Sequence, residues 1–238
     1  AWLAVKKRDF IAGTFVWSGF DFLGEPVPYQ WPARSAYYGI VDLAGFPKDV
    51  YYMYQSEWTT KPVLHIFPHW NWNKGEMVDV WAYYNNADEV ELFINEKSQG
   101  VKRKTGDEMH VVWKVNFEPG IVKAISRKNG KTVLVKEIST TGAPAKIILQ
   151  ADRSQLKAGA NDLSFVTVKI CDDQGRVVPG ATDKVKFTIQ GDASIAGTDN
   201  GLQTDLSLFQ STERKAWAGL CLAVIRSGKQ KGKIMLEA

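Results

Sequence analysis

Residues 77–94 read MVDVWAYYNNADEVELFI, and the alternation in this stretch decides the fold class. Val78, Val80, Ala82 and Tyr84 occupy every second position, which places them on one face of an extended strand. The last six residues, EVELFI, alternate again after the turn-forming letters NNAD. Two alternating strands joined by a short polar turn predict an antiparallel sheet with one buried face.

The same pattern continues on both sides of this hairpin. The strands predicted between residues 61 and 141 are 63–67, 77–84, 89–94, 110–117, 121–127 and 132–138. Asn129-Gly130 separates the last two and is a strong hairpin signal. Short strands at this spacing predict an immunoglobulin-like β-sandwich over residues 61–141.

Residues 142–238 repeat this organisation after a plausible linker, Gly142-Ala143-Pro144. The strands predicted here are 147–149, 163–171, 184–189, 216–225 and 233–236. Their number and spacing predict a second immunoglobulin-like sandwich of ordinary size.

Residues 1–60 differ from the rest of the chain. Residues 10–17 form a short apolar run, rich in β-branched and aromatic side chains, that predicts a fully buried strand. A long loop rich in glycine and proline follows to Pro47, and residues 48–58 have the spacing of a helix. One strand, one loop and one helix cannot bury their own faces, so this unit is a fragment of an α/β fold.

Composition bounds the function classes. The 238 residues are 45% hydrophobic and 24% charged, which excludes long disorder, collagen and coiled coil. No run of about 18 apolar residues occurs, so no membrane-spanning helix is expected. The net charge of +4 comes from 30 basic and 26 acidic residues, and this small excess argues against nucleic acid as a partner. The chain begins at Ala1 instead of Met, as if cut from something longer.

Two cysteines in a chain of this length exclude a disulfide scaffold. Cys171 and Cys221 lie on two predicted strands, so a bridge between sheets is conceivable. If Val166, Val168 and Ile170 face the core, Cys171 faces outward. We therefore favour two free thiols over a disulfide.

Two carboxylates follow the first predicted strand, within residues 17–26, WSGFDFLGEP. Asp21 and Glu25 lie there among aromatic rings, which can stack on the apolar face of a sugar. Paired carboxylates that flank a sugar bond catalyse glycoside hydrolysis. The favoured alternative is that both carboxylates hold backbone N–H groups or Arg34, because spacing in a loop fixes no distance.

Four segments of this region resemble the last (β/α)8 barrel unit of family 2 glycoside hydrolases, most closely the β-galactosidase branch of polysaccharide-degrading bacteria. These segments are 14–21, 23–26, 31–35 and 39–49. Segments resembling the two domains that follow the barrel are 68–72, 90–95, 151–153, 162–168 and 199–201. The resemblance therefore implies a mainly-β chain with two immunoglobulin-like sandwiches, residues 61–141 and 142–238. Before them, residues 1–60 would be the remnant of a (β/α)8 barrel, consisting of its last strand, a long loop and a helix.

The family uses two glutamates in a retaining double displacement, and these lie on earlier barrel strands. The resemblance thus implies that the catalytic glutamates lie upstream of Ala1 and that no residue of this chain is catalytic. Trp17 resembles the tryptophan at the base of the galactose pocket, although packing in a barrel core is its alternative role. Weaker candidates for substrate contact are Asp21, Glu25, Trp31 and Arg34.

The resemblance implies a β-galactoside as the partner of the whole enzyme, no cofactor, and a periplasmic or secreted location. A barrel unit with unburied faces could also self-associate into an oligomer. One departure from the family concerns a turn, where Asn95-Glu96 stands in place of the usual Asn-Gly. That substitution requires a positive φ from a residue other than glycine if the turn type is kept.

No metal site is expected. His65, His69 and His110 are scattered and read as structural residues. Asp172-Asp173 and Asp199-Asn200-Gly201 lack the regular oxygen-ligand spacing of a calcium loop, so we expect them to cap turns.

Two other functions compete with an accessory part of a hydrolase. One is a non-catalytic carbohydrate-binding module, which needs an exposed, flat aromatic platform. The tryptophans available for that platform are Trp70, Trp72, Trp81 and Trp113. The other is a purely structural spacer, which would bind no sugar.

Overall fold

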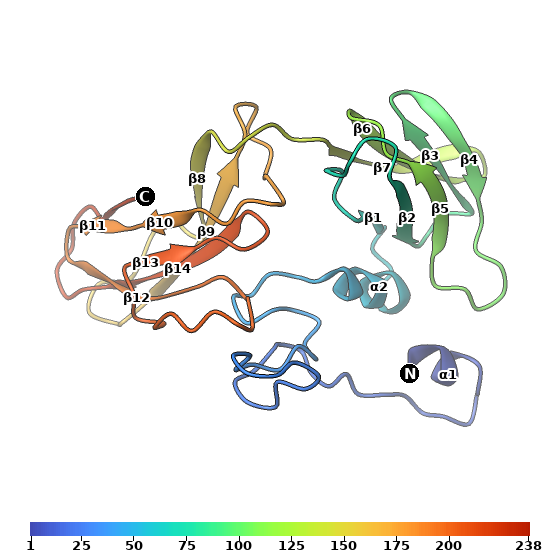
Figure 1. Cartoon of the computed structure of the whole chain (residues 1–238). Helices are drawn as coiled ribbons and strands as arrows, with labels where there is room; N and C mark the ends of the chain where they lie inside the picture. The colour runs from blue at the N-terminus through green and yellow to red at the C-terminus, as the bar shows by residue number, and fades with distance from the viewer. The chain divides into compact units, whose positions relative to one another are not determined.

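The computed structural model describes all 238 residues and divides them into two compact units (Figure 1). Unit 1 contains Ala1–Gly19 and Pro47–Thr140, and unit 2 contains Phe20–Phe46 and Thr141–Ala238. Strands far outnumber helices, so the prediction of a mainly-β fold is confirmed. The long loop, which we expected to group with residues 1–60, instead packs with the C-terminal residues in unit 2.

Unit 1 is a sandwich of two antiparallel sheets. Its strands are β1 (Leu64–Phe67), β2 (Met77–Tyr84), β3 (Glu89–Ile94), β4 (Lys97–Lys102), β5 (Val111–Asn116), β6 (Ile121–Lys128) and β7 (Lys131–Ser139). One sheet has the order β1-β2-β5 and the other has the order β4-β3-β6-β7. The alternation read from the sequence matches the burial, because Val78, Val80, Ala82 and Tyr84 all face the core.

The core between these sheets also holds two of the tryptophans considered for a sugar platform. Trp70 is 1% exposed, and its indole nitrogen donates to the carbonyl oxygen of Glu118 at 2.9 Å. Trp113 is 2% exposed and donates to the carbonyl oxygen of Gly100 at 3.1 Å. Both are packing residues, since a buried indole with a satisfied N–H offers no face to a sugar.

Helix α2 (Asp49–Trp58) matches the predicted helix and packs on β1 and β2. The ring of Tyr52 stacks on His65 with centroids 3.9 Å apart. The Nε2 atom of His65 lies 2.7 Å from Oδ1 of Asp49 at the first turn of the helix. These contacts give His65 a structural role, as the sequence predicted.

The other end of α2 holds the short helix α1 (Trp2–Lys6). Oε2 of Glu57 accepts from the indole nitrogen of Trp2 at 3.0 Å and from Nζ of Lys6 at 2.9 Å. Lys104, from the loop after β4, lies 3.7 Å from the other oxygen of the same carboxylate. The three donors lower the pKa of Glu57 against the opposing effect of its burial.

Unit 2 is also built from antiparallel strands. They are β8 (Lys146–Ala151), β9 (Leu163–Cys171), β10 (Lys184–Lys186), β11 (Thr188–Gln190), β12 (Ala193–Asp199), β13 (Glu213–Lys215), β14 (Leu220–Ser227) and β15 (Met235–Glu237). The large sheet has the order β12-β14-β9-β8, and the pairs β10-β13 and β11-β15 form two small sheets. Val166, Val168 and Ile170 of β9 belong to its core, as the alternation predicted.

The strand predicted at residues 10–17 is wrong. No strand forms there, and Phe10 and Phe15 are 84% and 101% exposed. A strand is stabilised by a partner that satisfies its backbone N–H and C=O groups, and these residues pair with none in a sheet. The apolar composition of the run is therefore not matched by burial within this chain.

Three strands were not predicted, namely β4, β12 and β13. The edge strand β4 is almost entirely exposed and lacks apolar alternation. Small residues make up much of β12, and β13 has only three residues. The single strand expected at 184–189 is two strands, β10 and β11, which pair with different partners on either side of the buried Phe187.

Cys171 and Cys221 are free thiols, as favoured from the sequence. Both are buried, although the alternation predicted that Cys171 faces outward. The chain turns back after β9, and the backbone of Val177 forms an antiparallel bridge with Cys171. Burial raises the pKa of Cys221 to about 12 and also raises that of Cys171.

Neither helix has both the length and the apolar composition that a membrane-spanning segment requires.

The turn between β3 and β4 keeps the left-handed geometry despite its unusual residue. Asn95 and Glu96 have φ of +48° and +68°, and the β6–β7 turn, Asn129-Gly130, has +50° and +73°. The two hairpins of this sheet therefore use the same backbone form, once with glutamate and once with glycine at the second position. A residue with a Cβ is strained in this conformation.

We expect Glu96→Gly to stabilise the protein by about 1 kcal/mol, because glycine adopts a positive φ without steric cost. The lost contact with Lys123 contributes little, since Glu96 is largely exposed. Urea denaturation of the protein measures this change as a higher midpoint at constant slope. The matched variant Gly130→Glu should lower the midpoint by a similar amount. Equal midpoints for all three proteins would contradict this account of the turn.

Candidate functional site

Trp17 is the residue expected at the base of a sugar pocket, and its side chain is 72% exposed. It belongs to unit 1 by its contacts, and the peptide bond that joins it to Ser18 is cis. A substrate-stacking role requires one open face of this indole. The other four candidates, Asp21, Glu25, Trp31 and Arg34, belong to unit 2.

Residues 22–36 of unit 2 form an irregular hairpin. The backbone nitrogen of Gly24 donates to Arg34 at 2.8 Å, and that of Ala36 donates to Phe22 at 2.8 Å. The tip of this hairpin exposes Trp31, with 80% of its surface accessible, and Glu25, which has a φ of +46°. Both side chains are exposed and lie between the paired residues Gly24 and Arg34 in the sequence.

Asp21 has a different position and is only 3% exposed. Its Oδ1 accepts from the backbone nitrogen of Gly39 at 2.9 Å, and its own nitrogen donates to Val41 at 2.9 Å. A Cβ on Gly39 would overlap the backbone of Phe20 and Asp21, so glycine is required at this approach. Asp21 thus closes the loop on itself, which is the role that the sequence favoured over acid–base chemistry.

Arg34 contacts the C-terminal sandwich. Its guanidinium lies over the ring of Phe209, with 4.4 Å to the centroid. Its backbone nitrogen donates to the carbonyl oxygen of Gln203 at 3.0 Å, and Nη2 lies 3.5 Å from the carbonyl oxygen of Ser207. The side chain therefore anchors the hairpin through a cation–π contact and backbone hydrogen bonds.

Asp42 lies near the other end of the same segment, where Oδ1 accepts from the backbone nitrogen of Phe46 at 2.8 Å. Its carboxylate packs so closely on Gly201 that a Cβ there would overlap it. Burial raises the pKa of Asp42 from 3.8 to about 6, and the charges of Asp199 and Asp21 add to this effect.

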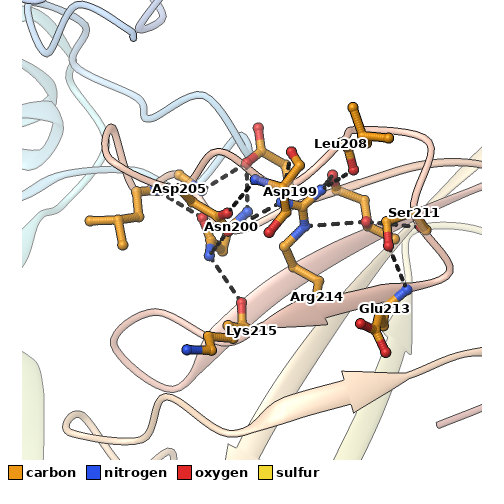
Figure 2. A network of polar contacts seen from close by, with 12 residues as sticks. Asp199, Asn200, Asp205, Leu208, Ser211, Glu213, Arg214 and Lys215 are labelled. Atoms are coloured by element: carbon orange, nitrogen blue, oxygen red, sulfur yellow. Dashed lines mark hydrogen bonds and ion pairs between the residues drawn. The ribbon is translucent and has the colours of Figure 1, made fainter. Parts of the chain in front are cut away.

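The loop that meets Arg34 and Asp42 connects β12 to β13, residues 200–212, and is called the β12–β13 loop below. Arg214, 1% exposed, extends from β13 into its centre (Figure 2). Nη2 of Arg214 donates to the carbonyl oxygens of Thr198 and Leu208, both at 2.7 Å, and Nη1 donates to Oδ2 of Asp205 at 3.1 Å. The buried cation is thus neutralised by a carboxylate and solvated by backbone carbonyls.

Asn200 completes this network. Its Nδ2 donates to Oδ2 of Asp205 at 2.7 Å and to the carbonyl oxygen of Lys215 at 3.0 Å. Oδ1 of Asp199 accepts from the backbone nitrogens of Asn200 and Gly201 at 2.7 and 3.3 Å. These bonds give Asp199-Asn200-Gly201 the turn-capping role expected from the sequence.

Asp172 caps the turn after β9 in the same way. Its Oδ1 accepts from the backbone nitrogens of Gln174 and Arg176 at 3.1 and 2.9 Å, and its Oδ2 accepts from Gly142 at 3.1 Å. The Arg176 side chain and these N–H groups hold the pKa of Asp172 well below its usual range, although burial opposes this effect. Both aspartate motifs are therefore satisfied by the protein's own donors.

Sequence reasoning missed Asp42, Phe209 and Arg214. Each acts through a partner that is distant in the sequence, so no local spacing marks it. The only local indication for Arg214 is its place in β13, a strand of three charged residues. Side chains alternate between the two faces of a strand, and Arg214, in the middle, points inward. Such a pattern is usual for an exposed strand and did not predict a buried cation.

Two parts of the chain match known domain families. Residues 147–238 match the family described as glycoside hydrolase family 2 C-terminal domain 5, and residues 75–134 match a domain of unknown function, DUF4982. The chain is 58% identical over 234 residues to the β-galactosidase BoGH2A of Bacteroides ovatus. The matched region covers 98% of this chain and 28% of that protein. The chain is the C-terminal part of a glycoside hydrolase family 2 protein.

Other family 2 relatives carry two different names. A putative β-glucuronidase of Formosa agariphila is 38% identical over 212 residues, covering 86% of this chain and 20% of that protein. The crystal structure of a β-glycosidase from Bacteroides vulgatus has a TM-score of 0.93 at 35% identity, over 99% of this chain and 30% of that one. The chain thus spans less than a third of the length of these family 2 proteins. The resemblance to the β-galactosidase branch is confirmed.

The raised pKa of Asp42 makes the stability of this family 2 chain depend on pH. The folded protein binds the proton of Asp42 more tightly than the unfolded chain does, so this group favours folding below about pH 4. That contribution is lost as the pH rises through about 6. Asp42→Asn stays neutral and retains an acceptor for Phe46, so it should stabilise the protein by about 1–2 kcal/mol at pH 7 and not at pH 4. Urea midpoints of both proteins across this range measure the difference, and a difference independent of pH would refute the assignment.

Proposed function

We propose that this chain is the C-terminal, accessory part of a retaining β-galactoside hydrolase. In this proposal the two catalytic glutamates lie on barrel strands outside these residues. Trp17 supplies one wall of the sugar pocket, and the two sandwiches brace the barrel. The observation that carries the proposal is the match of residues 147–238 to glycoside hydrolase family 2 C-terminal domain 5. The 58% identity to a β-galactosidase supports the choice of a galactoside.

An exposed indole suits this role for a physical reason. Its face is large, rigid and apolar, so it can cover the C–H face of a sugar with little loss of conformational entropy. A stacking side chain adds binding energy without taking part in bond cleavage, which agrees with an accessory role for the chain.

The carbohydrate-binding alternative has less support. Two of the four tryptophans it needs, Trp70 and Trp113, lie in the core of unit 1. A third, Trp81, is half-buried and faces the rings of Phe67 and His110, with centroids 6.0 and 4.3 Å away. Rings that face one another do not form the flat, open platform that sugar binding requires.

We expect Trp17→Ala, in the protein that carries the complete barrel, to lower kcat/KM for a nitrophenyl β-galactoside by about tenfold or more. This corresponds to about 1–3 kcal/mol by analogy with base stacking on aromatic rings. Trp17→Phe should retain part of the activity. Trp217→Ala removes an indole that is 47% exposed in unit 2 and serves as the control. An unchanged kcat/KM for Trp17→Ala would remove this residue from the site, and assays with a nitrophenyl β-glucuronide distinguish the two family activities.

The 238 residues by themselves should hydrolyse neither substrate, because the chain supplies a pocket wall and no acid–base pair. The assay is the release of nitrophenol at high protein concentration, with circular dichroism to establish that the chain is folded. Turnover that survives repurification and depends on a carboxylate such as Glu25 would show that a catalytic site lies within these residues.

A further inference from the structure

The β12–β13 loop is held from within by a buried cation. Arg214 binds the carbonyl oxygen of Thr198, at the end of β12, and that of Leu208, within the loop, and it pairs with Asp205 between them. Because these acceptors come from strand β12 and from two positions in the loop, one guanidinium fixes the path of the loop. A loop whose backbone carbonyls are bound in the interior is stiffer than an ordinary surface connection.

This loop contacts the 20–46 segment at two places far apart in the segment. At the first, the carbonyl oxygen of Gln203 and the ring of Phe209 hold the backbone and the guanidinium of Arg34. At the second, Gly201 packs on the carboxylate of Asp42. Two separate points of attachment restrain the translation and rotation of the intervening residues.

Arg34 also lies in the paired part of the 22–36 hairpin. Its carbonyl oxygen accepts from the backbone nitrogen of Gly24 at 2.8 Å, so a restraint on Arg34 is passed to the opposite strand. The tip between these strands, with Glu25 and Trp31, is exposed and has no regular secondary structure. The orientation of the tip therefore depends on how firmly its base is held.

We propose that the β12–β13 loop of the C-terminal sandwich positions the 20–46 segment for substrate binding, with Arg34 and Phe209 as positioning residues. This inference rests on the proposed function, because it takes the segment to belong to the sugar pocket. It assigns the last sandwich a role in the site that neither a spacer nor a separate binding module would have.

The chemistry of the contact defines the variants. A planar guanidinium stacks on an aromatic face, whereas an ammonium on a flexible stem does so poorly. Arg34→Lys keeps the charge and loses the planar contact, and Phe209→Leu keeps an apolar side chain and loses the ring. Phe93→Leu is the matched control, because Lys123 lies 5.7 Å from the centroid of Phe93 in unit 1, outside the proposed contact.

Hydrogen exchange of the backbone amides tests the restraint without substrate. We expect Arg34→Lys and Phe209→Leu to speed exchange at Gly24 and Ala36 by about fivefold or more, since a cation–π contact of about 1 kcal/mol is lost. Exchange in β9 should stay unchanged, which shows that the sandwich remains folded. In the enzyme that carries the complete barrel, the same variants should raise KM more than they lower kcat.

The outcomes separate this proposal from the function on which it rests. Unchanged exchange at Gly24 and Ala36 in both variants overturns the positioning role. Faster exchange with unchanged KM and kcat overturns it as well, because the segment then moves without consequence for the substrate. The Trp17→Ala assay tests the proposed function separately. If that substitution leaves kcat/KM unchanged, the hydrogen-exchange result still decides whether the β12–β13 loop restrains the 20–46 segment. Phe93→Leu should match the unsubstituted protein in every measurement.

Discussion

A buried guanidinium must have its charge balanced and its donors satisfied, and this constraint organises the C-terminal unit. Arg214 meets it with Asp205 and with carbonyl oxygens of the chain around it. Removal of one partner would leave an uncompensated charge in the interior, which typically costs about 3–5 kcal/mol. The path of the β12–β13 loop, and with it the ring presented to Arg34, therefore follows from the burial of one side chain.

Much of the fold could be predicted from the sequence because both sandwiches bury alternate residues. The bounds of β2, β3 and β9 match the prediction to the residue. Strands without that signal were missed, and the edge strand β4 shows why: its lysines and serine face solvent and carry no periodic pattern. The prediction of a strand at residues 10–17 failed for the opposite reason. Its apolar pattern requires partner strands, and no strand of this chain pairs with it.

The candidate site was predictable only in part. The turn-capping aspartates agree with the expectation from the sequence, whereas the role of Trp17 stays a prediction. The position of Arg34 on Phe209 joins residues 175 positions apart, and that of Asp42 on Gly201 joins residues 159 apart. No local spacing encodes such contacts. The grouping of the 20–46 segment with the last sandwich is the finding that the sequence did not indicate.

The burial of the two thiols determines their chemical reactivity. Cys171 and Cys221 are both buried and unbridged, and each is kept protonated by its surroundings. A thiol in that state is neither a good nucleophile nor a ready target for oxidants. These two sandwiches therefore do not depend on a disulfide bond between Cys171 and Cys221 for their stability.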